Sequence, residues 1–78
     1  MFLEIITPDK KLFSGEVNSI KLPGKDGSFG IFKNHAPIIA SLKKGSVKVV
    51  DEKQFVQNFE INGGVVEALK NNIIILAE

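Results

Sequence analysis

The sequence predicts an all-β protein, either an antiparallel sandwich or a small barrel. Apolar and polar residues alternate with a period of two along most of the chain, and no convincing helical stretch is present. The apolar runs are short, and turn-forming residues separate them at regular spacing. A chain of 78 residues, 44% of them hydrophobic, is expected to form one domain over residues 1–78. Folding buries only about 60% of the surface at this size, so we expect the core to depend on regular architecture or on a partner.

The first half of the chain contains four expected strands. Residues 8–10 form a turn after the first strand, and residues 23–27 give the strongest turn signal of the chain. Gly15, within the second strand, indicates a bulge or a close backbone approach. The fourth run has some helical spacing, but it is short and isoleucine-rich and Gly45 follows it closely, so a strand is favoured. The expected strands are residues 2–6, 12–22, 28–32 and 38–42.

The second half contains four more expected strands, joined by polar turns. Residues 51–53 predict a hairpin turn, after which Phe55, Phe59 and Ile61 share one face of a strand. Asn71 and Asn72 predict a tight turn, because asparagine tolerates a positive φ. The last run is apolar at every position, which is typical of a strand covered on both faces. These strands are residues 46–50, 54–61, 65–70 and 73–76.

Composition argues against several classes of function. The net charge is +1, and all ten basic residues are lysine. Arginine, tyrosine and tryptophan are absent, which disfavours reading or stacking of nucleic acid bases. The absence of cysteine excludes disulfides, thiolate metal sites and cysteine nucleophiles. The chain has no apolar run of membrane-spanning length and no signal-peptide pattern, so we expect contact with a membrane only through an assembly.

No catalytic, cofactor or metal site emerges from the residues. His35 is the only histidine, whereas a metal site needs three or four converging ligands. Ser14 and Ser28 lack the surroundings of a nucleophile elbow. The glycines of residues 24–30 have no following helix to bind phosphate, so they indicate a tight turn. Asp51 and Glu52 are expected at a solvated hairpin tip. We therefore expect no cofactor.

Two binding functions stay open as alternatives. The first is a lipoyl or biotinyl carrier domain, in which Lys53 at a hairpin tip would accept the group, although Glu52 and Gln54 are not the usual neighbours. The second is an oligonucleotide-binding barrel, which the near-neutral charge disfavours.

The loops carry a family resemblance. In order they read Thr7-Pro8, Phe13-Ser14-Gly15, Pro23-Gly24-Lys25-Asp26-Gly27-Ser28-Phe29-Gly30-Ile31, His35-Ala36-Pro37, Leu42, Gly45, Asn62-Gly63-Gly64 and Ile75-Leu76-Ala77-Glu78. This pattern closely resembles the N-terminal β-sandwich domain of the epsilon subunit of F-type ATP synthases. The match covers essentially the whole chain, and the stretch from Pro23 to Pro37 is its most specific part.

The resemblance implies a flattened antiparallel β-sandwich of about ten short strands. It also implies a rotor subunit of the central stalk without an active site. Such a domain binds the gamma subunit and rests on the membrane ring of c subunits, at the cytoplasmic face of the cell inner membrane. Rotation of the ring, driven by proton or sodium flow, then passes through gamma to the catalytic head.

Specific positions carry over from the resemblance. The ring-facing rim corresponds to Asp26, Gly27, Ser28, Phe29, Gly30 and Ile31, with His35 in the neighbouring loop. Thr7 and Ser46 match positions that face gamma. Phe29 and Phe32 are expected in the core rather than in the interface.

The chain departs from the family pattern in three respects. Ser28 stands where many relatives carry an acidic residue, which removes one expected charge contact with the ring. Lys33 and Asn34 replace a proline-containing step before the His-Ala-Pro loop. Most epsilon subunits also continue into a C-terminal helical hairpin, so we carry over neither inhibition of hydrolysis nor ATP sensing. The opening Met1 favours a natural short form over a truncated chain.

Overall fold

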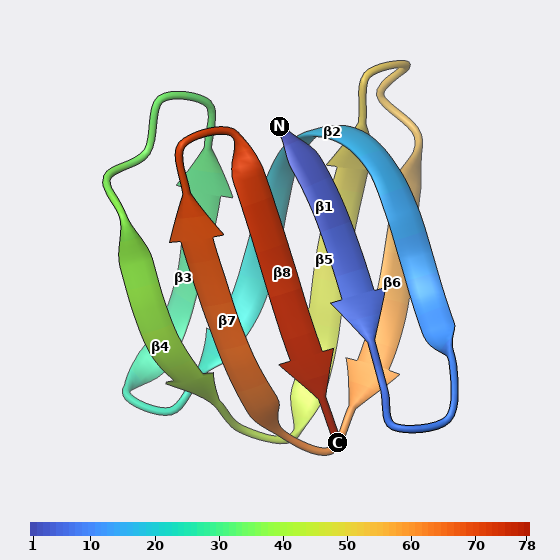
Figure 1. The fold of residues 1–78 in the computed structure, drawn as a ribbon, viewed down its shortest axis with the longest axis vertical. Coiled ribbons are helices and arrows are strands. Elements are labelled where there is room, and N and C mark those ends of the chain that lie inside the picture. Colours follow the sequence, from blue (N-terminus) through green and yellow to red (C-terminus); the bar gives the residue numbers. More distant parts are fainter.

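The computed structural model describes residues 1–78 and consists of strands and turns in two packed layers (Figure 1). All eight runs predicted as strands are strands, including the fourth, for which a helical turn was the alternative. The strands are β1 (Phe2–Ile6), β2 (Lys11–Gly24), β3 (Gly27–Phe32), β4 (Ile38–Leu42), β5 (Gly45–Asp51), β6 (Val56–Ile61), β7 (Gly64–Leu69) and β8 (Asn72–Ala77).

The two layers share the long strand β2. One layer runs in the order β4–β7–β8–β1 and ends on the first half of β2, and the other runs β3–β2–β5–β6 (Figure 1). All neighbouring strands are antiparallel except β1 and β8, which pair in parallel. The fold is therefore the predicted sandwich, but with eight strands rather than about ten. One continuous strand of 14 residues serves both layers and is counted once, which accounts for part of the difference.

The core lies between the layers and contains 16 buried hydrophobic residues. The alternation of apolar and polar residues produces this core, since alternate residues such as Val47 and Val49 on β5 point inward. Burying one such side chain fully contributes about 1.5–3 kcal/mol. The expectation that β8 is covered on both faces is wrong, because Leu76 is 52% exposed. Strand β8 lies within one layer, so its second face remains uncovered.

Strand β2 changes layers at a bulge. Alternation along the expected strand predicts Val17 on one face and Ile20 and Leu22 on the other, which is wrong because all three are buried in the core. The register of β2 against β5 shifts between Val17 and Ser19, which leaves Asn18 as an extra residue. This bulge lets Val17 and Ile20, which would otherwise face opposite sides, both reach the core. A second shift against β1 lies near Leu12. The bulge or close approach expected at Gly15 is wrong, because that residue pairs regularly with Leu3 and an added Cβ would have ordinary contacts.

The hairpin between β5 and β6 is closed by backbone hydrogen bonds and by one side chain. The backbone N–H groups of Asp51 and Gln54 donate to the carbonyls of Phe55 and Asp51, each at 3.0 Å. The Asp51 Oδ1 atom accepts hydrogen bonds from the backbone N–H groups of Lys53 at 2.8 Å and Phe55 at 3.0 Å. Gln54 completes the turn with a φ of 70°. The turn is therefore longer than predicted, and Phe55 lies in it, 65% exposed, instead of sharing the inner face with Phe59 and Ile61.

The hairpin between β7 and β8 turns one residue earlier than predicted. Leu69 and Asn72 are the last paired residues, so the turn consists of Lys70 and Asn71. The positive φ of 56° belongs to Lys70 rather than to either asparagine.

Candidate interaction surfaces

One end of the sandwich gathers several of the positions expected to contact other chains. The turn between β1 and β2, the tip between β2 and β3, and the start of β5 all lie at the lower end in Figure 1. These segments carry Thr7, Asp26 and Ser46, respectively. We call this region the polar end, because its exposed groups are turn backbone and small or charged side chains.

Thr7 organises the first of these turns. Its Oγ1 atom donates a hydrogen bond to the carbonyl of Lys10 at 3.0 Å and accepts one from the Lys10 N–H at 3.1 Å. The backbone N–H of Thr7 also donates to the same carbonyl at 2.8 Å. A short polar side chain that bonds the backbone three residues on stabilises a tight turn. The turn is therefore held in one shape on the side that could face a partner.

The tip between β2 and β3 depends on two glycines. Gly24 is buried, and a Cβ there would lie 2.4 Å from the carbonyl oxygen of Gly27 and 2.7 Å from the ring of Phe29. Gly27 has a φ of 132°, a conformation that other residues rarely adopt. Lys25 and Asp26 form a two-residue turn between Gly24 and Gly27, which confirms the predicted turn. The turn is shorter than predicted, because Pro23 and Gly24 still belong to β2.

The expected ring-facing residues divide between surface and core. Asp26, Gly27, Ser28 and Gly30 are exposed, whereas Phe29 packs against the core. Ile31 is 1% exposed, so its side chain contributes to the core and does not reach a surface. The period of two along β3 explains this division.

His35 lies apart from the polar end. It belongs to the loop after β3, at the opposite end of that strand from Asp26 (Figure 1). Its Nδ1 lies 3.0 Å from the carbonyl oxygen of Ala36 and can donate a hydrogen bond to it, while Nε2 is buried without a partner. The structure therefore does not bring His35 together with the rest of the expected rim.

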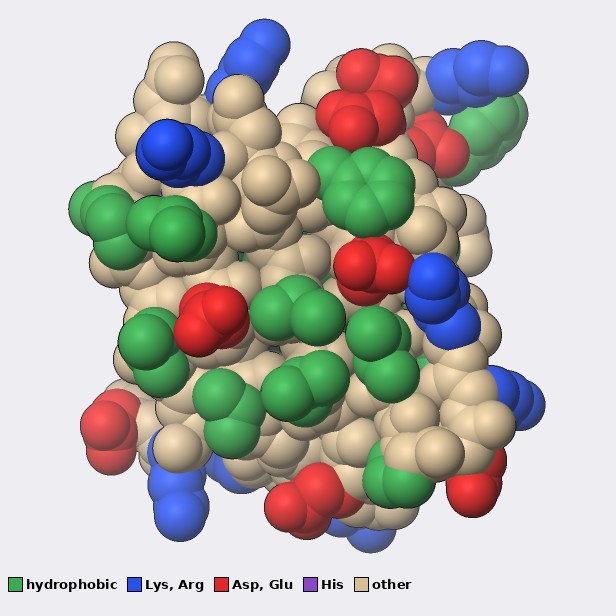
Figure 2. Space-filling model, in the orientation of Figure 1, with side chains coloured by type: hydrophobic (Ala, Val, Ile, Leu, Met, Phe, Trp, Pro, Cys, Tyr) green, Lys and Arg blue, Asp and Glu red, His purple; other side chains and the backbone are tan.

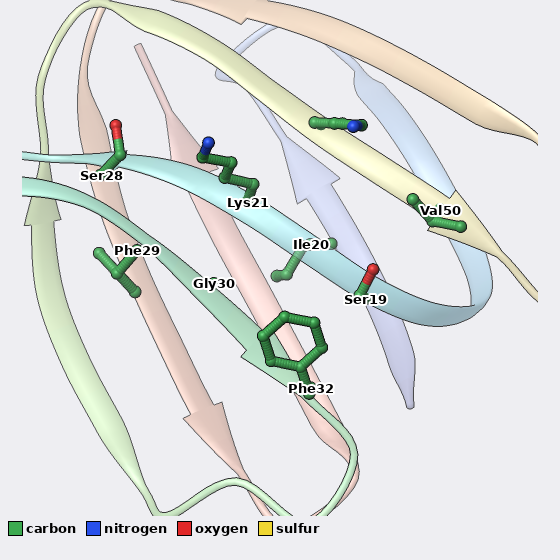
Figure 3. A pocket seen from close by; sticks show the side chains of 9 residues that line it. Ser19, Ile20, Lys21, Ser28, Phe29, Gly30, Phe32 and Val50 are labelled. Carbon is green, nitrogen blue, oxygen red and sulfur yellow. The ribbon is translucent and has the colours of Figure 1, made fainter.

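The outer face of the β3–β2–β5 layer forms a shallow hollow (Figure 3). Its floor is at Gly30, and Phe32 lies on the same face two residues further on. Phe32 is 64% exposed, so the expectation that it belongs to the core is wrong. A Cβ on Gly30 would lie 3.0 Å from the Phe32 ring, which shows that the ring covers this glycine. Alternation along β3 from the buried Ile31 was the signal that could have predicted this.

The opposite outer face is apolar. Figure 2 shows hydrophobic side chains spread over β1, β7 and β8. Two acidic positions interrupt them, Glu67 and a Glu4 whose carboxylate lies 2.9 Å from the Lys11 Nζ atom. Exposed apolar surface of this kind is typical of contact with another chain. The strongly exposed members are Ile39, Val65, Leu69 and Leu76, and the half-buried ones are Phe2, Ile6 and Ile74.

Three further observations concern other kinds of site and function. No group of three His, Cys, Asp or Glu side chains is placed so that it could hold a metal ion. The structure contains no helix with enough length and apolar character to cross a membrane. Lys53 is exposed at the hairpin turn between β5 and β6, which is where the carrier-domain alternative expected it.

The fold and its exposed faces define a class of small β-sandwich domain. Residues 1–78 match the family model described as "ATP synthase, Delta/Epsilon chain, beta-sandwich domain". The chain therefore belongs to this family, which confirms the resemblance found in its loops.

Relatives in this family carry the name "ATP synthase epsilon chain". The chain is 46% identical to the one from Chlorobium limicola over 76 residues, covering 97% of this chain and 86% of the relative. It is 40% identical over 78 residues to the one from Desulfatibacillum aliphaticivorans, but spans only 55% of that longer relative. The family includes members that differ in length beyond the sandwich.

Solved structures confirm the fold. A chain in the mitochondrial ATP synthase of Euglena gracilis, in a structure described as OSCP/F1/c-ring, superimposes with a TM-score of 0.90 at 21% identity. A chain in the central stalk and c-ring of the Tetrahymena thermophila enzyme gives 0.81 at 20% identity. This chain spans 48% and 62% of those chains, respectively.

Proposed function

We propose that residues 1–78 act as a single, non-catalytic rotor domain in the central stalk of an F-type ATP synthase. The domain binds the gamma subunit and the c-ring, and it helps to couple ion-driven rotation to ATP synthesis in the catalytic head. Membership of the epsilon family supports this proposal, as does the likeness to a chain in a structure of a central stalk and c-ring.

The observation that carries the proposal is the polar end. Three segments far apart in sequence lie at this same end of the sandwich, and they carry Thr7, Asp26 and Ser46 (Figure 1). Turns with small side chains allow the backbone of another chain to approach closely, which suits contact with the polar loops of the ring. Asp26, Gly27 and Ser28 face the ring in this arrangement.

We place the gamma subunit on the outer face of the β3–β2–β5–β6 layer and not on the apolar face of the other layer, because Ser46 lies on the former, at the start of β5. This outer face adjoins the polar end. It also carries the exposed apolar side chains of Phe32 and Val56, 64% and 51% exposed, which favour burial against a partner. Thr7 contacts gamma from the neighbouring turn, and His35 lies beyond Phe32 at the far end of β3.

The domain acts through binding, and the catalytic groups belong to other subunits. Its single histidine faces the carbonyl of Ala36 within a loop. The domain requires no cofactor. It is held at the cytoplasmic face of the cell inner membrane as a peripheral component, through the ring.

Native mass spectrometry with the cognate gamma subunit tests the proposal. We expect a one-to-one complex, and intact mass of the protein from its own cells should show no adduct on Lys53. Absence of a complex would contradict the proposal, provided that circular dichroism shows the chain to be folded. A lipoyl or biotinyl mass on Lys53 would instead support the carrier-domain alternative.

A further inference from the structure

Two lysines oppose each other directly on the outer face of the β2–β5 pair. Lys21 on β2 is the register partner of Lys48 on β5, and both side chains are exposed. Like charges directly opposite each other in an antiparallel pair destabilise the sheet. Neither lysine is in an ion pair, since the two ion pairs of the structure join Met1 to Glu16 and Lys11 to Glu4. The isolated domain therefore places two like charges opposite each other with no ion-pair partner.

The surroundings of the two lysines form a recess. Gly30 on β3 is the register partner of Lys21 and has no side chain of its own, so the nearest aromatic group of that strand is the Phe32 ring, which lies over Gly30. Ser19 lies on the same strand as Lys21, and Phe32 stands beside it on β3 (Figure 3). These residues line the hollow of this layer together with Lys48, and we call Ser19, Lys21, Gly30, Phe32 and Lys48 the lysine face.

Little negative charge on this face can neutralise the pair from within the chain. Asn58 on β6 is the register partner of Lys48, and the acidic residue of that strand, Glu60, instead opposes Ser46. No Glu60 carboxylate contact with a lysine lies within ion-pair distance. The face therefore offers two ammonium groups, a hydroxyl and an aromatic ring to an occupant.

We propose that the lysine face binds an acidic segment of the gamma subunit. A carboxylate of that segment lies between the two ammonium groups, and an apolar neighbour packs on Phe32. Charge complementarity supports this occupant, because a carboxylate replaces a repulsion by two attractions. The lysine face is also continuous with the proposed gamma contact, since Ser46 lies on the same face of β5 two residues before Lys48. The inference rests on the proposed function, in which this layer faces gamma.

Charge reversal separates the binding role of the pair from its effect on stability. Lys48→Glu turns a repulsive cross-strand pair into an attractive one, so the melting temperature of the isolated chain should rise by roughly 2–4 °C. The affinity for gamma should nevertheless fall by about tenfold or more, because the new carboxylate repels the acidic segment. A merely structural role of Lys48 would not give a more stable protein that binds less tightly.

Two further variants complete the set. The double variant Lys21→Glu/Lys48→Glu restores a like-charged pair, so its melting temperature should return to that of the wild type while binding to gamma weakens further. Lys70→Glu is the matched control, because Lys70 is exposed in the β7–β8 turn of the other layer. It makes the same change in net charge and should alter the affinity by less than about twofold.

Binding of all four proteins to gamma is measured by isothermal titration at low and high salt. We expect the wild-type affinity to fall with salt more steeply than that of the double variant, because the pair loses its attraction to a carboxylate. If the wild type binds gamma and the double variant binds equally well, the inference is overturned and the proposed function stands. If the wild type does not bind gamma at all, both fail. Binding of a single-stranded oligonucleotide that competes with gamma would also overturn the acidic-segment assignment.

Discussion

Glycine at position 24 shows how one residue determines the shape of the polar end. The strand pair β2–β3 closes so tightly there that a methyl group would meet the Gly27 carbonyl oxygen at 2.4 Å. The contacting atoms include backbone, so the clash cannot be relieved by a side-chain rotation alone. The identity of this residue is thus linked directly to the geometry of the loop proposed to face the ring.

Gly24→Ala is therefore expected to destabilise the protein by about 1–3 kcal/mol, through overpacking at the hairpin. Gly15→Ala is the matched control, because an added Cβ there would lie no closer than 3.6 Å to the Phe13 ring and the backbone φ is ordinary. We expect the control to unfold at the same urea concentration as the parent or slightly above it, since alanine restricts the unfolded chain more than glycine does. Equal losses in the two variants would contradict the account of the hairpin.

At the scale of elements, the hairpin between β5 and β6 is held by two backbone hydrogen bonds and by one carboxylate. Asp51 accepts two backbone hydrogen bonds in the turn and sets the residue at which β6 begins. It also explains why Phe55 leaves the inner face that alternation assigned to it.

Asp51→Ala should lower the free energy of unfolding by about 1–2 kcal/mol, because two backbone donors of the turn lose their acceptor. The neighbouring Glu52→Ala removes an exposed side chain that makes no hydrogen bond in the structure, and should change it by less than about 0.5 kcal/mol. Denaturant titration of both variants provides the comparison. An Asp51→Ala protein that is as stable as Glu52→Ala would show that the turn forms without the carboxylate.

The elements differ in how far the sequence could predict them. The number, type and order of the strands follow from the period of two and from the turn residues, because both act locally. The bulge at Asn18 leaves only one local trace, the change in apolar phase between Val17 and Ile20. Its position depends on the long-range pairing of this strand with β5 after it leaves β1. The same reason explains why β2 was not expected to serve both layers.

The candidate site was predictable to a lesser degree. The loop pattern from Pro23 to Pro37 identified the family, which the family match confirms. Sequence reasoning did not find that Phe32 is exposed, nor that Lys21 and Lys48 are neighbours, because cross-strand register depends on pairing between distant segments. The assignments of individual residues to gamma or to the ring stay predictions.

At the scale of the whole molecule, the outer surface has three distinct parts. The polar end carries turns (Figure 1), the β3–β2–β5–β6 layer carries the lysine face (Figure 3), and the β4–β7–β8–β1 layer carries the apolar face (Figure 2). The core between the layers is small, because the chain buries only 19 of its 78 residues. A domain of this size gains stability when a partner covers part of its surface.

Site-directed cross-linking in the assembled ATP synthase tests the central claim most directly. The natural chain contains no cysteine, so a single introduced thiol reports one position without background. The variants are Asp26→Cys at the polar end, Ser46→Cys on the layer proposed to face gamma, and Leu69→Cys on the apolar face as the control. We predict a cross-link from Asp26→Cys to the c-ring, one from Ser46→Cys to gamma, and none from Leu69→Cys to either. Cross-links from Leu69→Cys to gamma, with none from Ser46→Cys, would contradict the account.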